Sequence, residues 1–168
     1  MRRESDIQTL PFRAAGLGAV AGLRSMAAPA LLARAVQRGE VGELQDTRFA
    51  VLGFPKVSTT LQLLMVGEMV ADKTPFIPSR TSAPALLGRA LSGTLVGAAL
   101  FAAERRRPAS GAVLGALSAT AAAYAGEMFR TKGAQKLGVP DQVLALLEDG
   151  AVLLGGTYLP RGPELAEA

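Results

Sequence analysis

The strongest constraint on the fold of this chain is a series of five apolar segments separated by short charged or proline-containing connections. The segments cover residues 12–36, 49–71, 84–103, 108–126 and 140–159. A bilayer core about 30 Å thick is crossed by about 20 residues of helix, which each segment approaches or exceeds. The pattern predicts an all-α, multi-pass integral membrane bundle of about four to five transmembrane helices.

Prolines support these boundaries. Pro108 and Pro140 begin segments, where the missing N–H of proline costs no helical hydrogen bond, and Pro75 and Pro78 follow the second segment closely. The chain therefore divides into a polar N-terminal segment, a single transmembrane helical domain and a short exposed tail, over residues 1–11, 12–160 and 161–168.

The apolar residues are mostly small. Hydrophobic residues make up 49% of the chain, but aromatic residues make up only 5% and tryptophan is absent. Helices rich in glycine and alanine approach one another closely, as is common within membranes. The mean hydropathy is only +0.29, and charge interrupts most segments, so an alanine-rich soluble helical bundle is the alternative.

Several functional classes are disfavoured by what the sequence lacks. Without cysteine or histidine there are no disulfides, no thiolate chemistry and no zinc site of the usual kind. Nucleotide-binding loops and nucleophile elbows are not found. The formal charge of +4 comes from basic residues that flank apolar segments without interleaved aromatics, which argues against nucleic-acid binding. The sequence favours a protein that is not an enzyme and has no cofactor, apart from a divalent cation considered below.

Three charges lie near the middle of apolar segments. Arg24 interrupts the first, and Glu148 and Asp149 are adjacent in the last. A charge at the bilayer centre costs on the order of 2.5–3.5 kcal/mol, so it normally faces a partner or water. We therefore predict that Arg24 pairs with Glu148 or Asp149, either as a functional centre or as a purely structural ion pair. Pro29 predicts a kink or break in the first helix.

The stretch "GEMVADKTPFIPSR" contains a second acidic pair. Glu68 and Asp72 are four residues apart, so a helix would place both carboxylates on one face. Such a pair can hold a divalent cation, bind a cationic substrate or relay protons, and Lys73 and Arg80 follow it closely enough to contact an anion. The alternative is that Asp72 and Lys73 mark the membrane boundary.

Glu127 and Arg130 close the fourth segment and are three residues apart. On a helix this spacing predicts an ion pair at the membrane interface.

The distribution of positive charge does not orient the bundle if every segment spans. Basic residues on the two sides are then nearly balanced, whereas membrane proteins usually carry an excess on the cytoplasmic side. One segment that does not cross would explain the balance, and so would insertion in both orientations. We favour a segment that does not cross.

Four stretches, "AGLRSMAAPALLA", "GEMVADKTPFIPSR", "PALLGRALSGTLVGAALF" and "LALLEDGAVLLGG", occur in this order. Together they resemble the bacterial membrane family called domain of unknown function 4126. The resemblance covers residues 14–156, and its most specific parts are the "E-x-x-A-D-K-x-P" core and the later "E-D" pair. It implies a multi-pass inner-membrane protein and emphasises the same acidic residues, but it brings no activity.

The sequence thus predicts a small transporter or channel-like protein of the bacterial inner membrane that uses intramembrane carboxylates. Candidate residues for binding substrate or ion are Arg24, Glu68, Asp72, Lys73, Arg80, Glu148 and Asp149, and Glu68 with Asp72 forms the candidate metal site. The expected partners are the lipid bilayer and either further copies of the chain or a larger membrane complex. The alternatives are an accessory or scaffold subunit, and a magnesium-dependent enzyme acting on lipid phosphates.

Overall fold

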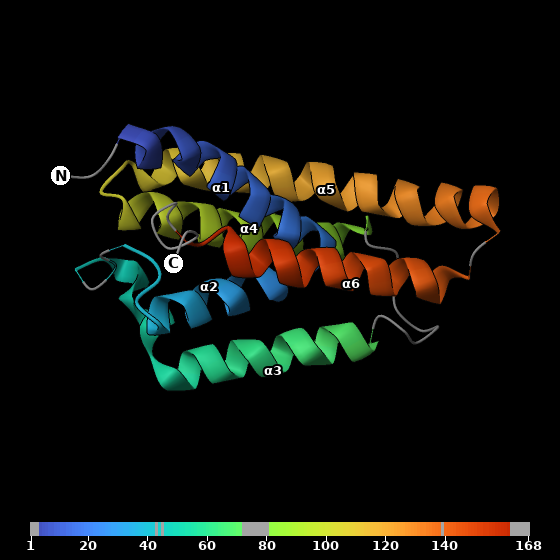
Figure 1. The fold of residues 1–168 in the computed structure, drawn as a ribbon, viewed down its shortest axis with the longest axis horizontal. Helices are drawn as coiled ribbons and strands as arrows, with labels where there is room; N and C mark the ends of the chain where they lie inside the picture. The colour runs from blue at the N-terminus through green and yellow to red at the C-terminus, as the bar shows by residue number, and fades with distance from the viewer. Residues whose placement is uncertain (1–3, 43, 45, 72–80, 139, 162–168) are drawn as a thin grey trace.

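The computed structural model describes residues 4–42, 44, 46–71, 81–138 and 140–161, and these residues form a helical bundle (Figure 1). The α-helices are α1 (Glu4–Leu23), α2 (Ala27–Gln37), α3 (Pro55–Ala71), α4 (Ala83–Ala103), α5 (Pro108–Leu137) and α6 (Asp141–Tyr158), and a 3-10 helix, η1 (Arg48–Gly53), precedes α3. The all-helical prediction is confirmed for this part of the chain. Helix α1 begins inside the segment that the sequence predicted to be polar and N-terminal.

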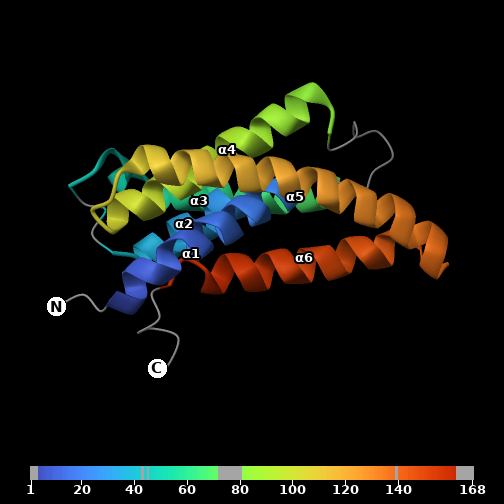
Figure 2. The same cartoon turned by 90° about the horizontal axis from the view of Figure 1, so that it is seen from above.

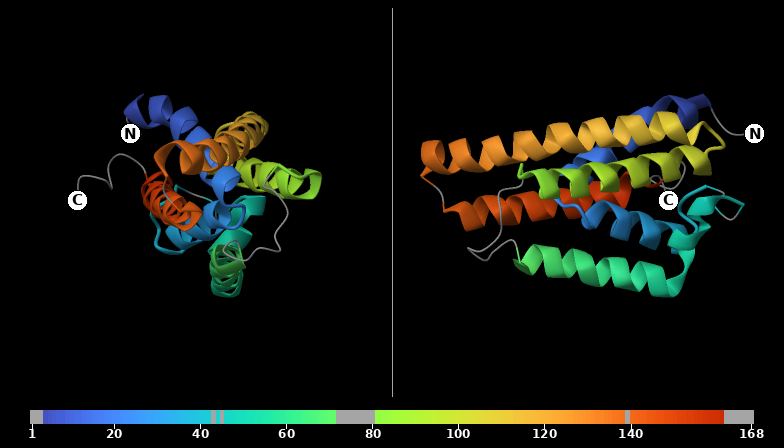
Figure 3. Two further views of the ribbon diagram at one scale, coloured as in Figure 1. Left: turned by 90° about the vertical axis from the view of Figure 1, so that its right-hand side faces the viewer. Right: turned by 180° about the vertical axis from the view of Figure 1, so that it is seen from behind.

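The first apolar segment forms two helices rather than one. Helix α1 runs into the bundle, the chain turns at residues 24–26, and α2 runs back towards the end at which α1 began (Figures 1 and 3). At that end Arg13 of α1 donates to the carbonyl oxygens of Leu159 and Pro160, just after α6. Beside them, Glu40 after α2 accepts two hydrogen bonds from Arg161. The middle of α1 and the residues after α2 therefore both contact the chain at the end of α6.

Pro29 was predicted to kink or break this helix, and the break in fact precedes it. Pro29 is the third residue of α2. In a first helical turn the absent N–H of proline has no intrahelical partner to lose. Pro29 is therefore accommodated within α2, and residues 24–26 form the turn.

The remaining helices run back and forth along the bundle (Figure 1). Helix α5 packs mainly against α4 and α1; in the view of Figure 2, α4 crosses behind α5 and α6 runs below it. Helix α3 lies at the periphery, where it packs mainly against α2 (Figure 3).

Glycines allow α4 and α5 to touch through their backbones. A Cβ atom built on Gly97 would lie 2.1 Å from the carbonyl oxygen of Gly111, and one built on Gly115 would lie 2.1 Å from that of Gly93. Helix α1 approaches α5 as closely, since a Cβ on Gly22 would lie 2.1 Å from the carbonyl oxygen of Ala119. No side chain fits at these contacts, so glycine sets the distance between the helices.

Many large apolar side chains lie on the outside, while the core is rich in small ones. Leu63 on α3 is 69% exposed, and Leu117 on α5 is 65% exposed. The buried core contains many alanines, among them Ala14, Ala21 and Ala99. Two helices of the described residues, α4 and the stretch Pro108–Gly133 of α5, are long and apolar enough to cross a membrane, which supports membrane association.

Candidate functional site at the turn of the α1–α2 hairpin

The turn between α1 and α2 leaves two helix ends inside the protein. The C-terminus of a helix exposes carbonyl groups without intrahelical donors, and the N-terminus exposes N–H groups without intrahelical acceptors. Buried polar groups of this kind are costly unless other groups satisfy them. Charged side chains from α3, α4 and α6 converge on this turn.

Arg89 of α4 satisfies the end of α1. Its Nη1 donates to the carbonyl oxygens of Gly22 and Leu23, at 2.8 Å each. The Arg89 residue is buried. A cation at a helix C-terminus also interacts favourably with the helix dipole. Arg89 therefore holds α1 through both hydrogen bonds and charge.

Glu68 of α3 satisfies the start of α2. One carboxylate oxygen, Oε1, accepts from the backbone N–H and the Oγ of Ser25, at 2.9 Å each, and Oε2 accepts from the N–H of Met26 at 2.8 Å. A carboxylate is favourable at a helix N-terminus for the same electrostatic reason. Ser92 of α4 closes the turn by donating from its Oγ to the carbonyl oxygen of Ser25.

Arg24, within the turn, binds Asp149 of α6. Its Nε donates to Oδ1 of Asp149 at 2.8 Å, and its Nη2 lies 2.6 Å from the same oxygen. Arg24 is only 1% exposed and is among the largest fully buried side chains. The predicted pairing of Arg24 with one of the two adjacent acids of the last segment is confirmed, and Asp149 is the partner.

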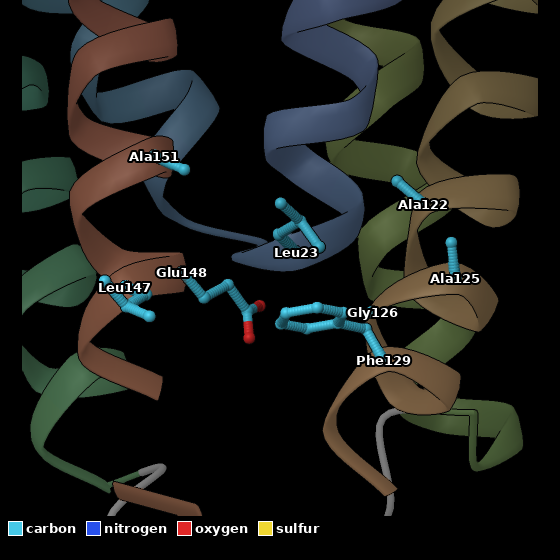
Figure 4. A pocket seen from close by; sticks show the side chains of 8 residues that line it. All are labelled: Leu23, Ala122, Ala125, Gly126, Phe129, Leu147, Glu148 and Ala151. Atoms are coloured by element: carbon cyan, nitrogen blue, oxygen red, sulfur yellow. The ribbon is translucent and has the colours of Figure 1, made fainter. Parts of the chain in front are cut away.

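Glu148, the residue before Asp149, lines a cavity of about 440 Å³ between α5 and α6 (Figure 4). The other lining residues are apolar or glycine: Leu23, Ala122, Ala125, Gly126, Phe129, Leu147 and Ala151. The Glu148 side chain extends from α6 towards the ring of Phe129 on α5. The residue is 8% exposed. A carboxylate thus faces an apolar cavity directly below the end of α1.

The candidate metal site is only partly described. Asp72, Lys73 and Arg80 lie outside the described residues, so their proposed roles stay predictions. Glu68 uses both carboxylate oxygens to accept hydrogen bonds from the α1–α2 turn. Among the described residues no group of three or more acidic side chains could hold a metal ion.

Glu127 lies next to the start of α4, where its Oε2 accepts a hydrogen bond from the backbone N–H of Thr81 at 3.1 Å. This contact joins the middle of α5 to the residues before α4. The ion pair of Glu127 with Arg130 stays a prediction.

Arg89 was missed by the sequence-based prediction. It interrupts the apolar segment "PALLGRALSG" as Arg24 interrupts the first segment, so the same signal was present. Ser25 and Ser92 gave no comparable signal, because serine is common in membrane helices and its role here depends on which backbone groups lie nearby.

The model of the family described as domain of unknown function (DUF4126) matches residues 12–166. This range includes the α1–α2 turn and every side chain that holds it. No curated protein and no solved structure matches the chain. The match covers nearly the whole bundle, and the chain therefore belongs to the DUF4126 family.

Proposed function

We propose that the protein is a multi-pass membrane protein in which α3, α4, α5 and α6 cross the bilayer and the α1–α2 hairpin enters it and returns to the same side. Helices α3 to α6 contain 17, 21, 30 and 18 residues, respectively. At about 1.5 Å per residue, the shortest is about 26 Å long, close to the thickness of a bilayer core.

Outward-facing apolar side chains support membrane crossing by α3 and α6 as well as by the more apolar helices α4 and α5. Helix α3 exposes Leu64 and Val70, and α6 exposes Leu146 and Leu154. Soluble monomeric proteins rarely expose large contiguous apolar surfaces, whereas lipid favours them. At the α1–α2 turn Arg24, Arg89 and Asp149 are buried and Glu68 is partly buried, as intramembrane charges normally are.

A hairpin that does not cross also changes the balance of positive charge. The connections at the open end of the hairpin then carry Arg38, Arg48, Lys56, Arg105, Arg106, Arg107 and Arg161. At the opposite end, the last turns of α5 contribute Arg130, Lys132 and Lys136, and the sequence between α3 and α4 adds Lys73 and Arg80. The open end keeps the excess, since Arg2 and Arg3 precede α1 there. Positive residues concentrate on the cytoplasmic side. We therefore place the open end of the hairpin, and the end of α6, in the cytoplasm, with the bundle in a bacterial inner membrane.

Single introduced cysteines test this orientation, since the chain has no native cysteine. In intact spheroplasts, a membrane-impermeant maleimide is expected to label Lys132→Cys and to leave Arg106→Cys unlabelled until the membrane is permeabilised. Both side chains are exposed in the bundle, so a difference in labelling reports the membrane rather than burial. Labelling of both variants in intact spheroplasts, or of Arg106→Cys alone, contradicts the proposed orientation.

Transport or permeation of a small cation is the function that this arrangement supports best. The observation that carries it is the turn of the α1–α2 hairpin, where Arg89 holds the end of α1 and Glu68 holds the start of α2. Non-helical backbone at membrane depth is tolerated only against protein or a water-filled cavity, and transporters place substrate sites at such interruptions. Among the described side chains of the turn and the cavity beside it, three carboxylates (Glu68, Glu148 and Asp149) lie near two arginines (Arg24 and Arg89), which favours a positive cargo.

Charge movement in proteoliposomes tests the proposal. Concentration jumps of H⁺, Na⁺, K⁺, Mg²⁺ and choline are applied to the reconstituted protein on a solid-supported membrane. At least one cation is expected to give a saturable current that falls at least tenfold in Glu148→Gln. Glu40→Gln, which alters a carboxylate at the open end of the hairpin, serves as the matched control and retains the current. If none of the five cations gives a current above protein-free liposomes, the proposal is wrong.

A scaffold role is the second candidate, and the closed pair of Arg24 with Asp149 favours it. In this case the turn would serve packing alone, and the apolar face of the peripheral helix α3 would bind another copy of the chain or a different subunit. This alternative requires an absence of current together with a stable oligomer or complex after purification. An enzyme acting on lipid phosphates stays a prediction that depends on Asp72, outside the described residues.

A further inference from the structure

The cavity beside the α1–α2 turn has features that restrict the cation it could accept. It lies between α5 and α6, and two of its lining residues, Phe129 and Leu147, are 53% and 64% exposed at the surface of the bundle. Its volume of about 440 Å³ lies within the range of about 300–1,000 Å³ typical of small-molecule sites. The cavity therefore has room for an organic molecule rather than a bare ion alone.

The apolar walls of the cavity and its carboxylate suit different parts of one ligand. Ala122, Ala125 and Ala151 offer only methyl groups, so this surface suits alkyl substituents and does not replace the hydration shell of a metal ion. Glu148 supplies a carboxylate, and the Phe129 ring lies across from it (Figure 4). Aromatic faces together with a carboxylate are suited to alkylated ammonium groups, because the positive charge is spread over an apolar shell.

We infer that the α5–α6 cavity binds an organic ammonium ion with short alkyl groups, its charge at Glu148 and its alkyl groups against Phe129 and the alanines. The inference rests on the proposed function, because it specifies the kind of cation that would be carried. Asp149, bound to Arg24, lies next to Glu148 on α6, so a cation in the cavity would lie close to the ion pair that fixes the α1–α2 turn.

The test uses the purified full-length protein in a neutral detergent and follows its helical circular dichroism on heating. A ligand that binds only the folded state raises the melting temperature. Choline chloride is compared with 3,3-dimethyl-1-butanol, which has the same shape without the charge, and with sodium chloride at equal ionic strength. Choline alone is expected to give a saturable rise.

Three variants assign the effect to the cavity. The apparent Kd for choline is expected to rise at least tenfold in Glu148→Gln and several-fold in Phe129→Leu, and to stay unchanged in Glu40→Gln. Melting curves without ligand show whether each variant folds, and Phe129→Leu, which keeps an apolar side chain near the surface, tests the site even if Glu148→Gln is destabilised. A rise with the neutral alcohol, an equal rise with sodium, or a rise that both cavity variants retain overturns the inference.

Free ammonium compounds and lipid headgroups share this chemistry, so short-chain phosphatidylcholine is compared with phosphatidylglycerol of equal chain length. Stabilisation by choline itself identifies a free cation as sufficient, whereas stabilisation by phosphatidylcholine without any response to choline assigns the effect to the intact lipid and overturns the inference. The two proposals fail separately. Currents of H⁺ or Na⁺ without any response to choline would leave the transport proposal standing and remove this inference. Binding of choline without any current would leave this inference standing and remove the transport proposal.

Discussion

Replacing Gly97 with alanine is expected to destabilise the bundle more than any other addition of a single methyl group to α4. The new Cβ atom would lie 2.1 Å from the carbonyl oxygen of Gly111, which belongs to the backbone of α5 and cannot rotate away. The two helices must therefore separate, and the contacts between them loosen along their length. We expect a loss of about 3 kcal/mol or more in the free energy of unfolding, at the upper end for overpacked sites.

Gly88→Ala on the same helix is the matched control. Nothing lies within 4 Å of a Cβ atom built on Gly88, and alanine is the better helix former. Its stability is expected to equal or slightly exceed that of the parent. Unfolding in mixed micelles with increasing SDS, followed by circular dichroism, compares the two variants directly. Equal stability of the two variants would show that the glycine contact does not set the distance between α4 and α5.

Breaking the ion pair of Arg24 with Asp149 is expected to have an effect of similar size. In Asp149→Leu the guanidinium of Arg24 stays buried at 1% exposure and loses the carboxylate of Asp149. Removing one partner of a buried pair typically costs about 3–5 kcal/mol, mostly because the remaining charge is uncompensated. The same SDS titration measures this loss.

The double variant Arg24→Leu with Asp149→Leu separates the cost of a stranded charge from the loss of packing. Because neither charge is left behind, most of the stability is expected to return. The pair of Glu40 with Arg161, in which each side chain is 22% exposed, provides the comparison, and its removal is expected to cost about 1 kcal/mol or less. If the loss of stability in the double variant equals the sum of the losses in Arg24→Leu and Asp149→Leu, the two charges do not act as a pair.

The buried charges could be found in the sequence because charge inside an apolar segment is costly wherever the segment packs. This argument found Arg24, Glu148 and Asp149 and predicted that Arg24 would pair with one of the two acids. The choice of Asp149 depended on the rotation of α6. Neighbouring residues on a helix point about 100° apart. One of the two acids therefore faces the turn, and the other faces the cavity.

The role of Glu68 could not be predicted from the spacing of residues along one helix. Its distance of four residues from Asp72 suggested a shared cation. In the folded protein the carboxylate of Glu68 accepts hydrogen bonds from Ser25 and Met26, more than 40 residues earlier in the chain. Spacing along one helix describes only neighbours on that helix. The exposed backbone N–H groups at the end of a different helix cannot be recognised from the sequence.

The sequence by itself determined the helical class, the bounds of α4 and α6 to within a residue and the presence of charges that need buried partners. These properties follow from local composition, because proline, glycine and runs of apolar residues act within a few positions of themselves. Only the tertiary structure decided that the first segment turns back at residues 24–26 rather than continuing to the far side. The turn exists because Glu68, Arg89 and Asp149, from three other helices, satisfy its exposed polar groups and the charge of Arg24 together. No single segment contains that information.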